Sequence, residues 1–273
     1  MTAGLRFLKG HGTQNDFVLL PDPQGAVELD AELVRRLCDR HAGLGADGVL
    51  HVVPSALHPD AADLADQAPW FMDHWNADGT TAEMCGNGVR VYARYLVQQG
   101  LAEPGRLSLA TRGGIKLVDV SVGDGPITVE MGVAAVGEAV DVDGVEATSV
   151  DMGNPHAVVP VPSVAALGEL KTSRLDLNVE YVEDVSPTAI RMRVHERGVG
   201  ETRSCGTGAC AAVVATSLRT GAPRGTAFDV EVLGGHLTVT WLEDGSVRMA
   251  GPAVLLAEGT IDADWLAGAS AGR

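Results

Sequence analysis

The sequence predicts an α+β fold built from two similar halves, and three observations support this. Short alternating apolar runs separated by Gly, Asp and Pro dominate the 273-residue chain, and such runs are typical of β-strands. Helical periodicity is confined to a few segments, which do not alternate strictly with the strands as they would in a doubly wound sheet. A C-G-x-G motif occurs at Cys85 and again at Cys205, 120 positions later. This spacing indicates an internal repeat at about half the chain length.

Each expected strand is a short apolar run bounded by turn residues. In chain order, the expected strands are Leu5–Leu8, Phe17–Leu20, Val49–Val53, Leu107–Ala110, Ile115–Val120, Ile127–Met131, Ala157–Val161, Ala189–Val194, Val230–Leu233, Leu237–Leu242 and Val247–Ala250. The last two are joined by Glu243–Ser246, a segment of turn residues. We therefore expect them to form a hairpin.

Three segments show clear helical periodicity, and a fourth is a shorter candidate. Ala31–His41 places Leu33, Val34, Leu37 and Cys38 on one face. The other expected helices are Asn87–Gln99, Gly208–Thr220 and the short segment Val164–Leu170. The two longest begin directly at the C-G-x-G motifs, so each half of the repeat contributes one such helix.

The charge balance excludes some classes of partner. The chain has 20 Lys and Arg against 36 Asp and Glu, a formal net charge of -16, whereas nucleic-acid-binding surfaces are usually basic. No stretch approaches the 18 or so apolar residues of a membrane span, and the N-terminus has no secretory apolar region. We therefore expect a cytoplasmic protein that binds neither nucleic acid nor a membrane.

The four cysteines are expected to be reduced, because a chain of this length does not depend on disulfides for its stability. No C-x-x-C pair and no H-x-x-H spacing occurs, so we expect no metal site. Cys38 and Cys210 are interpreted as core residues.

Cys85 and Cys205 each precede Gly-x-Gly at an expected helix N-terminus. Such an end has unsatisfied N–H groups and a partial positive charge, which bind carboxylates and lower the pKa of a thiol. Two thiols on opposite faces of one carbon suit a racemase or epimerase: one thiolate removes the α-proton, and the other thiol returns a proton to the opposite face. A lone cysteine is more often a small core residue, but the shared motif favours catalysis here.

Other features leave alternatives open. Glu196 and Arg197 form either a solvated turn or a proton relay with a carboxylate clamp, and His156 is either a turn histidine or a base that polarises a thiol. Gly43–Gly48 matches G-x-G-x-x-G, but it lies between a helix and a strand, the reverse of the order at a dinucleotide site. The three lysines suggest no pyridoxal phosphate site. We expect no cofactor.

Six segments spread over most of the chain carry a resemblance to a known family. They are His11–Phe17, Asn76–Gly79, Met84–Arg90, Met152–His156, Glu196–Thr202 and Ser204–Cys210. In these segments the sequence closely resembles the diaminopimelate epimerases, cofactor-independent enzymes of lysine and peptidoglycan precursor biosynthesis. The resemblance implies interconversion of LL-2,6-diaminopimelate and its meso form. It also implies two similar domains, each a curved, mostly antiparallel sheet wrapped around a central helix.

The expected domain boundaries and site residues follow from this resemblance. Residues 1–128 with 256–273 are expected to form the N-terminal domain carrying Cys85, and residues 129–255 the C-terminal domain carrying Cys205, with the active site in the cleft between them. Cys85 and Cys205 resemble the acid/base pair, assisted by His156 and Glu196. The substrate-binding residues that the resemblance implies are Asn15, Asn76, Gly86, Asn87, Asn154, Asn178, Glu196, Arg197, Gly206 and Thr207.

The chain departs from the family pattern in places. Many members have Gln where this chain has Gly48, so a substrate contact is absent or replaced, and Ser55–Pro69 resembles a loop insertion. A homodimer remains open. Proline racemase-like and hydroxyproline epimerase-like enzymes are the alternative family reading, although they tend to have His at the position of Asn87. A non-enzymatic binding module with two reduced cysteines is the alternative from another class.

Overall fold

The structure, a computed structural model, describes residues 4–268. It is mostly sheet with few helices, which confirms the predicted α+β class. The chain divides into two compact units. The first contains residues 4–12, 16–123 and 253–268, and the second contains residues 13–15 and 124–252.

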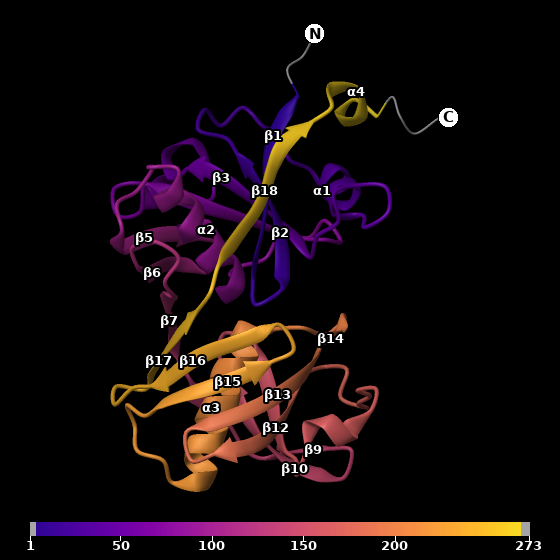
Figure 1. Cartoon of the computed structure of the whole chain (residues 1–273), viewed down its shortest axis with the longest axis vertical. Helices are drawn as coiled ribbons and strands as arrows, with labels where there is room; N and C mark the ends of the chain where they lie inside the picture. Colours follow the sequence, from indigo (N-terminus) through magenta and orange to yellow (C-terminus); the bar gives the residue numbers. More distant parts are fainter. Residues whose placement is uncertain (1–3, 269–273) are drawn as a thin grey trace. The chain divides into compact units, whose positions relative to one another are not determined.

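The first unit is one sheet with a helix packed against its inner face (Figure 1). Its strands are β1 (Leu5–Gly12), β2 (Asn15–Pro21), β3 (Gly48–Pro54), β4 (Trp70–Asn76), β5 (Gly105–Thr111), β6 (Gly114–Val120) and β18 (Val254–Ile261). Its helices are α1 (Ala31–Cys38), α2 (Gly86–Gln98) and α4 (Ala263–Leu266), with 3-10 turns at Ser55–Leu57 and Ala62–Leu64. Strand β18 pairs with β1 antiparallel, and β1 pairs with β2.

The second unit follows the same plan. Its strands are β7 (Ile127–Val133), β8 (Ala135–Val136), β9 (Val140–Val142), β10 (Val145–Asp151), β11 (Pro155–Pro160), β12 (Asn178–Ser186), β13 (Ala189–Glu196), β14 (Gly200–Thr202), β15 (Ala227–Val232), β16 (Gly235–Trp241) and β17 (Ser246–Gly251). Its helix is α3 (Gly206–Thr220), and Val164–Leu167 is a 3-10 turn. Strands β16 and β17 pair antiparallel, which confirms the predicted hairpin.

Strand pairing reveals the repeat that the C-G-x-G motifs indicated. In the first unit, parallel and antiparallel pairings alternate: β2 is parallel to β3, β3 antiparallel to β4, β4 parallel to β5 and β5 antiparallel to β6. In the second, β11–β12, β12–β13, β13–β15 and β15–β16 follow the same order. Helix α2 lies between β4 and β5 in the chain, and α3 lies between β13 and β15. The two halves therefore share one topology.

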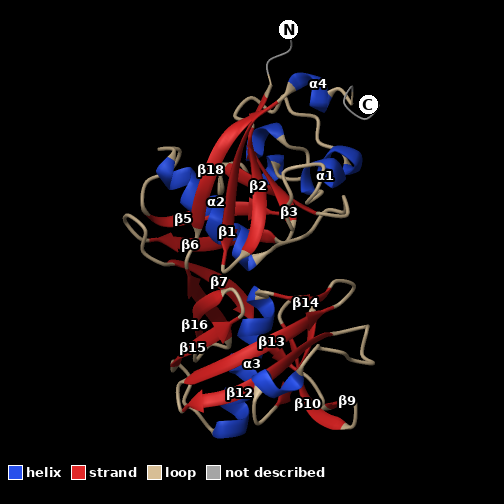
Figure 2. Ribbon diagram, turned by 45° about the vertical axis from the view of Figure 1, so that its right-hand side comes forward, coloured by secondary structure: helices blue, strands red, loops and turns tan. Residues whose placement is uncertain are grey.

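Each long helix is enclosed by its own sheet. Helix α2 contacts β1, β3, β4, β6 and β18, and in Figure 2 it passes behind β1 and β18. Helix α3 contacts β10 to β13 and β15 to β17. Its Gly-, Ala- and Val-rich sequence allows strands to approach from several sides, as expected for a helix that is apolar around most of its circumference. The curved sheets thus hold the starts of both helices in place.

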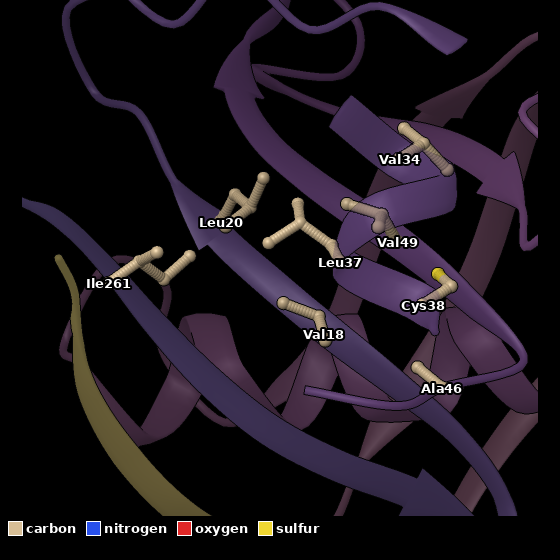
Figure 3. Close-up of a cluster of buried hydrophobic side chains, with 8 residues drawn as sticks. All are labelled: Val18, Leu20, Val34, Leu37, Cys38, Ala46, Val49 and Ile261. Atoms are coloured by element: carbon tan, nitrogen blue, oxygen red, sulfur yellow. The ribbon is translucent and has the colours of Figure 1, made fainter. Parts of the chain in front are cut away.

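A smaller helix packs against the outer face of the first sheet. Asp30 accepts a hydrogen bond from the N–H of Leu33 and so caps α1. Val34, Leu37 and Cys38 of α1 then pack against β2 and β3, and Figure 3 shows this cluster. Cys38 is therefore a core residue, as predicted, and burial raises the pKa of its thiol to about 11.

Several strands were not predicted: β4, β10, β12 and β18, together with the short β8, β9 and β14. Asp73 and His74 are buried in β4, and Glu180 is buried in β12, where these polar side chains mask the apolar pattern. The helix predicted over Ala31–His41 ends earlier, at Cys38. The apparent insertion Ser55–Pro69 is an ordered part of the first unit, because Ala61 and Ala68 pack in a cluster with Phe71.

Candidate active site

The two motif cysteines occupy equivalent positions in the two units. Cys85 is the residue before α2, with φ -137° and ψ 118°, and Cys205 is the residue before α3, with φ -119° and ψ 116°. Both therefore have the extended backbone of a helix N-cap residue. At Cys205 the sulfur also accepts a hydrogen bond from a first-turn N–H group, which is the arrangement that the motif predicted.

Cys205 is almost completely buried. Its Sγ accepts a hydrogen bond from the Gly208 N–H at 3.4 Å and lies 3.5 Å from Thr207 Oγ1. These contacts lower the thiol pKa, but burial, followed by the nearby carboxylates of Glu196 and Glu180, raises it well above its ordinary value. The expectation that the helix end lowers this pKa is therefore wrong for Cys205, since desolvation and negative charge outweigh the helix N–H groups.

His156 lies beside a carboxylate in the interior of the second unit. Its Nδ1 is 2.7 Å from Glu180 Oε1, its Nε2 is 3.1 Å from Asn154 Oδ1, and the side chains of both His156 and Glu180 are 0% exposed. Both ring nitrogens therefore face an oxygen atom, Nδ1 that of Glu180 and Nε2 that of Asn154. The structure thus places the ring in a buried polar network.

Sequence reasoning missed Glu180. A Cβ at Gly208 would lie 2.5 Å from Glu180 Oε1, so the carboxylate is packed against the first turn of α3. In the sheet register, Asn178 is opposite His156, and Glu180 is two residues further along, hence on the same face as Asn178. Had β12 been predicted, strand alternation would have placed Glu180 beside the predicted site residues.

The loop ahead of Cys205 brings three further predicted residues together. Thr202 Oγ1 donates a hydrogen bond to Glu196, whose charge acts on Cys205. Asn178 Oδ1 accepts from the backbone N–H of Arg197 at 2.9 Å, which fixes the position of that exposed residue. The loop is thus anchored to β12, and it is not simply a solvated turn.

The turn that contains Asn15 is also held against the start of α3. Thr13 and Gln14 have φ of 49° and 62°, a left-handed conformation that is uncommon for residues other than Gly. Thr13 Oγ1 lies 2.6 Å from Ser204 Oγ, and Arg203 Nε donates to Gln14 Oε1 at 2.5 Å. Asn15 directly follows Thr13 and Gln14 in the sequence, and these two residues contact Ser204 and Arg203, which precede Cys205.

In the first unit, three predicted residues lie at the start of α2 and a fourth ends β4. Cys85 is half-buried, Asn87 is buried in the first turn with Gly86, and Asn76 ends β4. Asn76 Nδ2 donates to Thr80 Oγ1 at 3.0 Å, which holds the amide at the end of its strand.

Gly48, where the resemblance led us to expect Gln, lies directly opposite Asn76 in the sheet. A Cβ at Gly48 would lie 2.5 Å from the Trp75 carbonyl oxygen and 3.3 Å from His74 Nε2. No longer side chain fits here unless β4 moves. The His74 imidazole stands beside this position, and burial lowers its pKa to about 4. It is therefore uncharged near neutral pH.

Residues 4–268 contain neither a metal-binding cluster nor a membrane-spanning helix. No group of three or more His, Cys, Asp or Glu side chains in this range is arranged to hold a metal ion. No helix in this range is both long and apolar enough to cross a membrane.

The sequence matches one protein family over most of its length. The family model described as diaminopimelate epimerase matches residues 7–136 and 148–256. The diaminopimelate epimerase of Streptomyces coelicolor is 50% identical over 287 residues, covering 98% of this chain and 99% of the relative. That of Corynebacterium glutamicum (strain ATCC 13032) is 42% identical over 279 residues, covering 96% of this chain and 99% of the relative.

Solved structures show the same fold at low sequence identity. A Bacillus anthracis phenazine biosynthesis protein of the PhzF family has a TM-score of 0.74 at 15% identity, covering 94% of this chain and 99% of that one. A hydroxyproline epimerase from Agrobacterium vitis has a TM-score of 0.70 at 15% identity, covering 96% and 94%. These two likenesses concern the fold alone. The family match and the curated relatives extend over nearly the whole sequence, and on that basis the chain belongs to the diaminopimelate epimerase family.

Proposed function

We propose that this chain is a cofactor-independent isomerase that interconverts LL-2,6-diaminopimelate and meso-2,6-diaminopimelate with two thiols. The observation that carries the proposal is the duplicated cysteine. One thiol precedes the central helix of each unit, in the same backbone conformation. Such a pair is what inversion of an α-carbon by two bases requires. Membership of the family supplies the substrate.

In the resting enzyme, Cys205 holds a proton and Cys85 is the thiolate. Support for this assignment comes from the Cys205 environment, in which burial, Glu196 and Glu180 raise the thiol pKa. Cys85 then removes the α-proton from one face of the substrate, and Cys205 gives its proton to the other face. Turnover leaves the opposite protonation pattern, which suits the reverse reaction, and the two thiols titrate as a couple.

The developing negative charge is stabilised by the helix starts. When the α-proton leaves, charge moves onto the α-carboxylate, and the first-turn N–H groups near Gly86, Asn87, Gly206 and Thr207 are suited to receive it. Fixed donors of this kind lower the barrier because they need little rearrangement during the reaction.

The distal end of diaminopimelate distinguishes it from simple amino acids, because it is a second stereocentre with an ammonium and a carboxylate. We propose that the Asn side chains, Glu196 and Arg197 bind this end. Neutral amides both donate and accept hydrogen bonds, and one guanidinium pairs with the carboxylate. The set is Asn15, Asn76, Asn87, Asn154, Asn178, Glu196 and Arg197. A substrate without the distal group loses these contacts.

The decisive experiment is incubation of the purified chain with LL-diaminopimelate in heavy water. We expect α-deuterium uptake and formation of the meso isomer, and neither should occur in Cys85→Ala or Cys205→Ala. The core variant Cys210→Ala serves as the matched control that retains the reaction. Absence of both uptake and product in the wild type refutes the function, normal turnover by either catalytic variant refutes the two-base mechanism, and turnover of proline favours the alternative family.

The proposal includes the expected arrangement of domains. The two units, whose bounds differ by a few residues from the expected 1–128 with 256–273 and 129–255, are proposed to face one another across the substrate, and a complex with a substrate analogue tests this. A cytoplasmic location and a homodimer belong to the same proposal. Light scattering of the purified chain measures the assembly, and a mass of 28.3 kDa refutes the homodimer.

A further inference from the structure

Glu180 links two parts of the second unit's site. Its Oε1 accepts the hydrogen bond from His156 Nδ1 at 2.7 Å. The same oxygen lies against the first turn of α3, 2.5 Å from where Gly208 would carry a Cβ. The Gly208 N–H donates to the Cys205 sulfur. One carboxylate oxygen therefore touches both the histidine and the turn that binds the catalytic sulfur.

The second oxygen of the same carboxylate is unusual. Glu180 Oε2 is buried, and no hydrogen-bond partner for it occurs among residues 4–268. A buried acceptor without a partner costs free energy, and a charged one costs more. A carboxylate in this position is therefore difficult to explain by packing alone, since an apolar side chain of similar size would avoid that cost.

We propose that Glu180 is a positioning residue for Cys205, acting through the His156 ring and the first turn of α3. Its Oε1 fixes the ring with Nδ1 toward the carboxylate and Nε2 toward Asn154. Its negative charge beside α3 disfavours a second negative charge on the sulfur. Cys205 consequently keeps its proton until the substrate has lost one to the other thiol. This inference rests on the proposed function.

The charges around Cys205 agree with this role. Burial makes the largest contribution to the raised pKa of the thiol, followed by Glu196 at the end of β13 and Glu180 on β12. Glu196 accepts a hydrogen bond from Thr202, and that loop leads to the exposed Arg197. Glu180 is instead fully enclosed, so its charge is less screened by solvent and depends on no loop movement.

The test is the pH dependence of iodoacetamide alkylation at Cys205, read by peptide mass spectrometry in the full chain. In Glu180→Gln, which keeps the shape and removes the charge, the alkylation midpoint is expected to fall by about one pH unit. The matched control is Glu183→Gln on the same strand, where the carboxylate contacts the Val164 N–H and Arg191 instead. Its midpoint is expected to stay at the wild-type value.

Catalysis gives a second measurement. Glu180→Gln is expected to lower kcat about tenfold while KM stays within about twofold, because the substrate-binding residues are unchanged. An unchanged Cys205 midpoint in folded Glu180→Gln overturns the inference. If that variant does not fold, Glu180→Asp decides, because it withdraws the carboxylate from Gly208 by one methylene. A smaller fall in the midpoint supports the inference, and no fall overturns it.

The alkylation measurement needs no turnover, so the two proposals fail separately. A wild-type chain that takes up no deuterium from heavy water refutes the proposed function. A wild-type chain that epimerises, beside a Glu180→Gln variant with an unshifted midpoint, refutes only the role of Glu180.

Discussion

Gly208 and Gly88 occupy the same place in the two C-G-x-G motifs, yet the structure predicts different results when each is changed to Ala. Both lie in helices, where Ala is favoured over Gly by about 1 kcal/mol. At Gly88 the new Cβ would meet Leu50 Cδ2 at 3.3 Å and Phe17 Cζ at 3.5 Å, contacts that a small side-chain movement relieves. We therefore expect Gly88→Ala to stay within about 1 kcal/mol of the wild type in stability.

At Gly208 the new Cβ would lie 2.5 Å from Glu180 Oε1, about 1 Å closer than an ordinary contact. Glu180 is enclosed and hydrogen-bonded to His156, so moving it breaks that bond. Overpacking costs about 1–3 kcal/mol and the lost charged hydrogen bond about 1.5–3 kcal/mol. After subtracting the gain in helix propensity, Gly208→Ala is expected to lose about 3 kcal/mol.

The assay is urea unfolding of both variants and the wild type, followed by circular dichroism. Histidine-selective ¹⁵N NMR spectra complement it, because loss of the Glu180 contact changes the His156 Nδ1 signal. The expected result is a lower unfolding midpoint and a shifted His156 signal in Gly208→Ala only. Equal stabilisation of both variants, with His156 unchanged, would refute the packing of Glu180 against α3 and with it the basis for the role of Glu180.

Two further predictions concern the first unit. The first concerns His51, which is hydrogen-bonded to the carboxylates of Asp73 and Asp22. Burial lowers the pKa of His51, but these hydrogen bonds outweigh burial and raise the pKa above its ordinary value. The interaction of protonated His51 with the two carboxylates therefore stabilises the fold fully below about pH 6.5, and less as the pH rises through the higher folded-state pKa. His51→Gln should therefore lose more stability at about pH 5.5 than at about pH 8.5, as measured by urea unfolding, and an equal loss at both would contradict the ion pair. The second concerns the cluster in Figure 3. Leu37→Ala removes a fully buried side chain and should lower the free energy of unfolding by about 3 kcal/mol, and Leu33→Ala, at a half-buried position, should lower it less. Equal losses of stability in the two variants would contradict this packing.

The sequence predicted well wherever pattern and chemistry coincided. Alternating runs located most strands, and the repeated motif located both helix starts and both cysteines. Two of the missed strands, β4 and β12, contain a buried charged residue in place of an apolar one. Strand β4 contains buried Asp73 and His74, and β12 contains buried Glu180. Because hydrophobic periodicity assumes that charged residues face solvent, neither segment was identified as a strand. The partners that make such burial tolerable, Arg112 for Asp73 and His156 for Glu180, are distant in sequence.

The same limitation explains the error about the Cys205 pKa. A helix N-terminus is a local feature that can be read from Gly and Cys spacing, and by itself it favours the thiolate. Burial depends on how the sheet encloses α3, and Glu180 and Glu196 come from β12 and β13. Neither contribution is visible in the motif. Sequence reasoning could therefore identify the candidate catalytic cysteines, but not the direction in which the pKa of Cys205 is shifted.

A two-base epimerase needs its thiols to be chemically alike and yet differently protonated at any moment. Duplication of a half-chain meets the first requirement, since it gives each cysteine the same N-cap backbone. Identical surroundings would leave the proton equally on either sulfur. The halves differ in burial, since Cys205 is buried and Cys85 half-buried, and in one contact: Gly208 faces the Glu180 carboxylate, whereas the equivalent Gly88 faces the side chains of Leu50 and Phe17. A negative charge beside one helix start and apolar atoms beside the other break the symmetry, as the proposed resting proton on Cys205 requires.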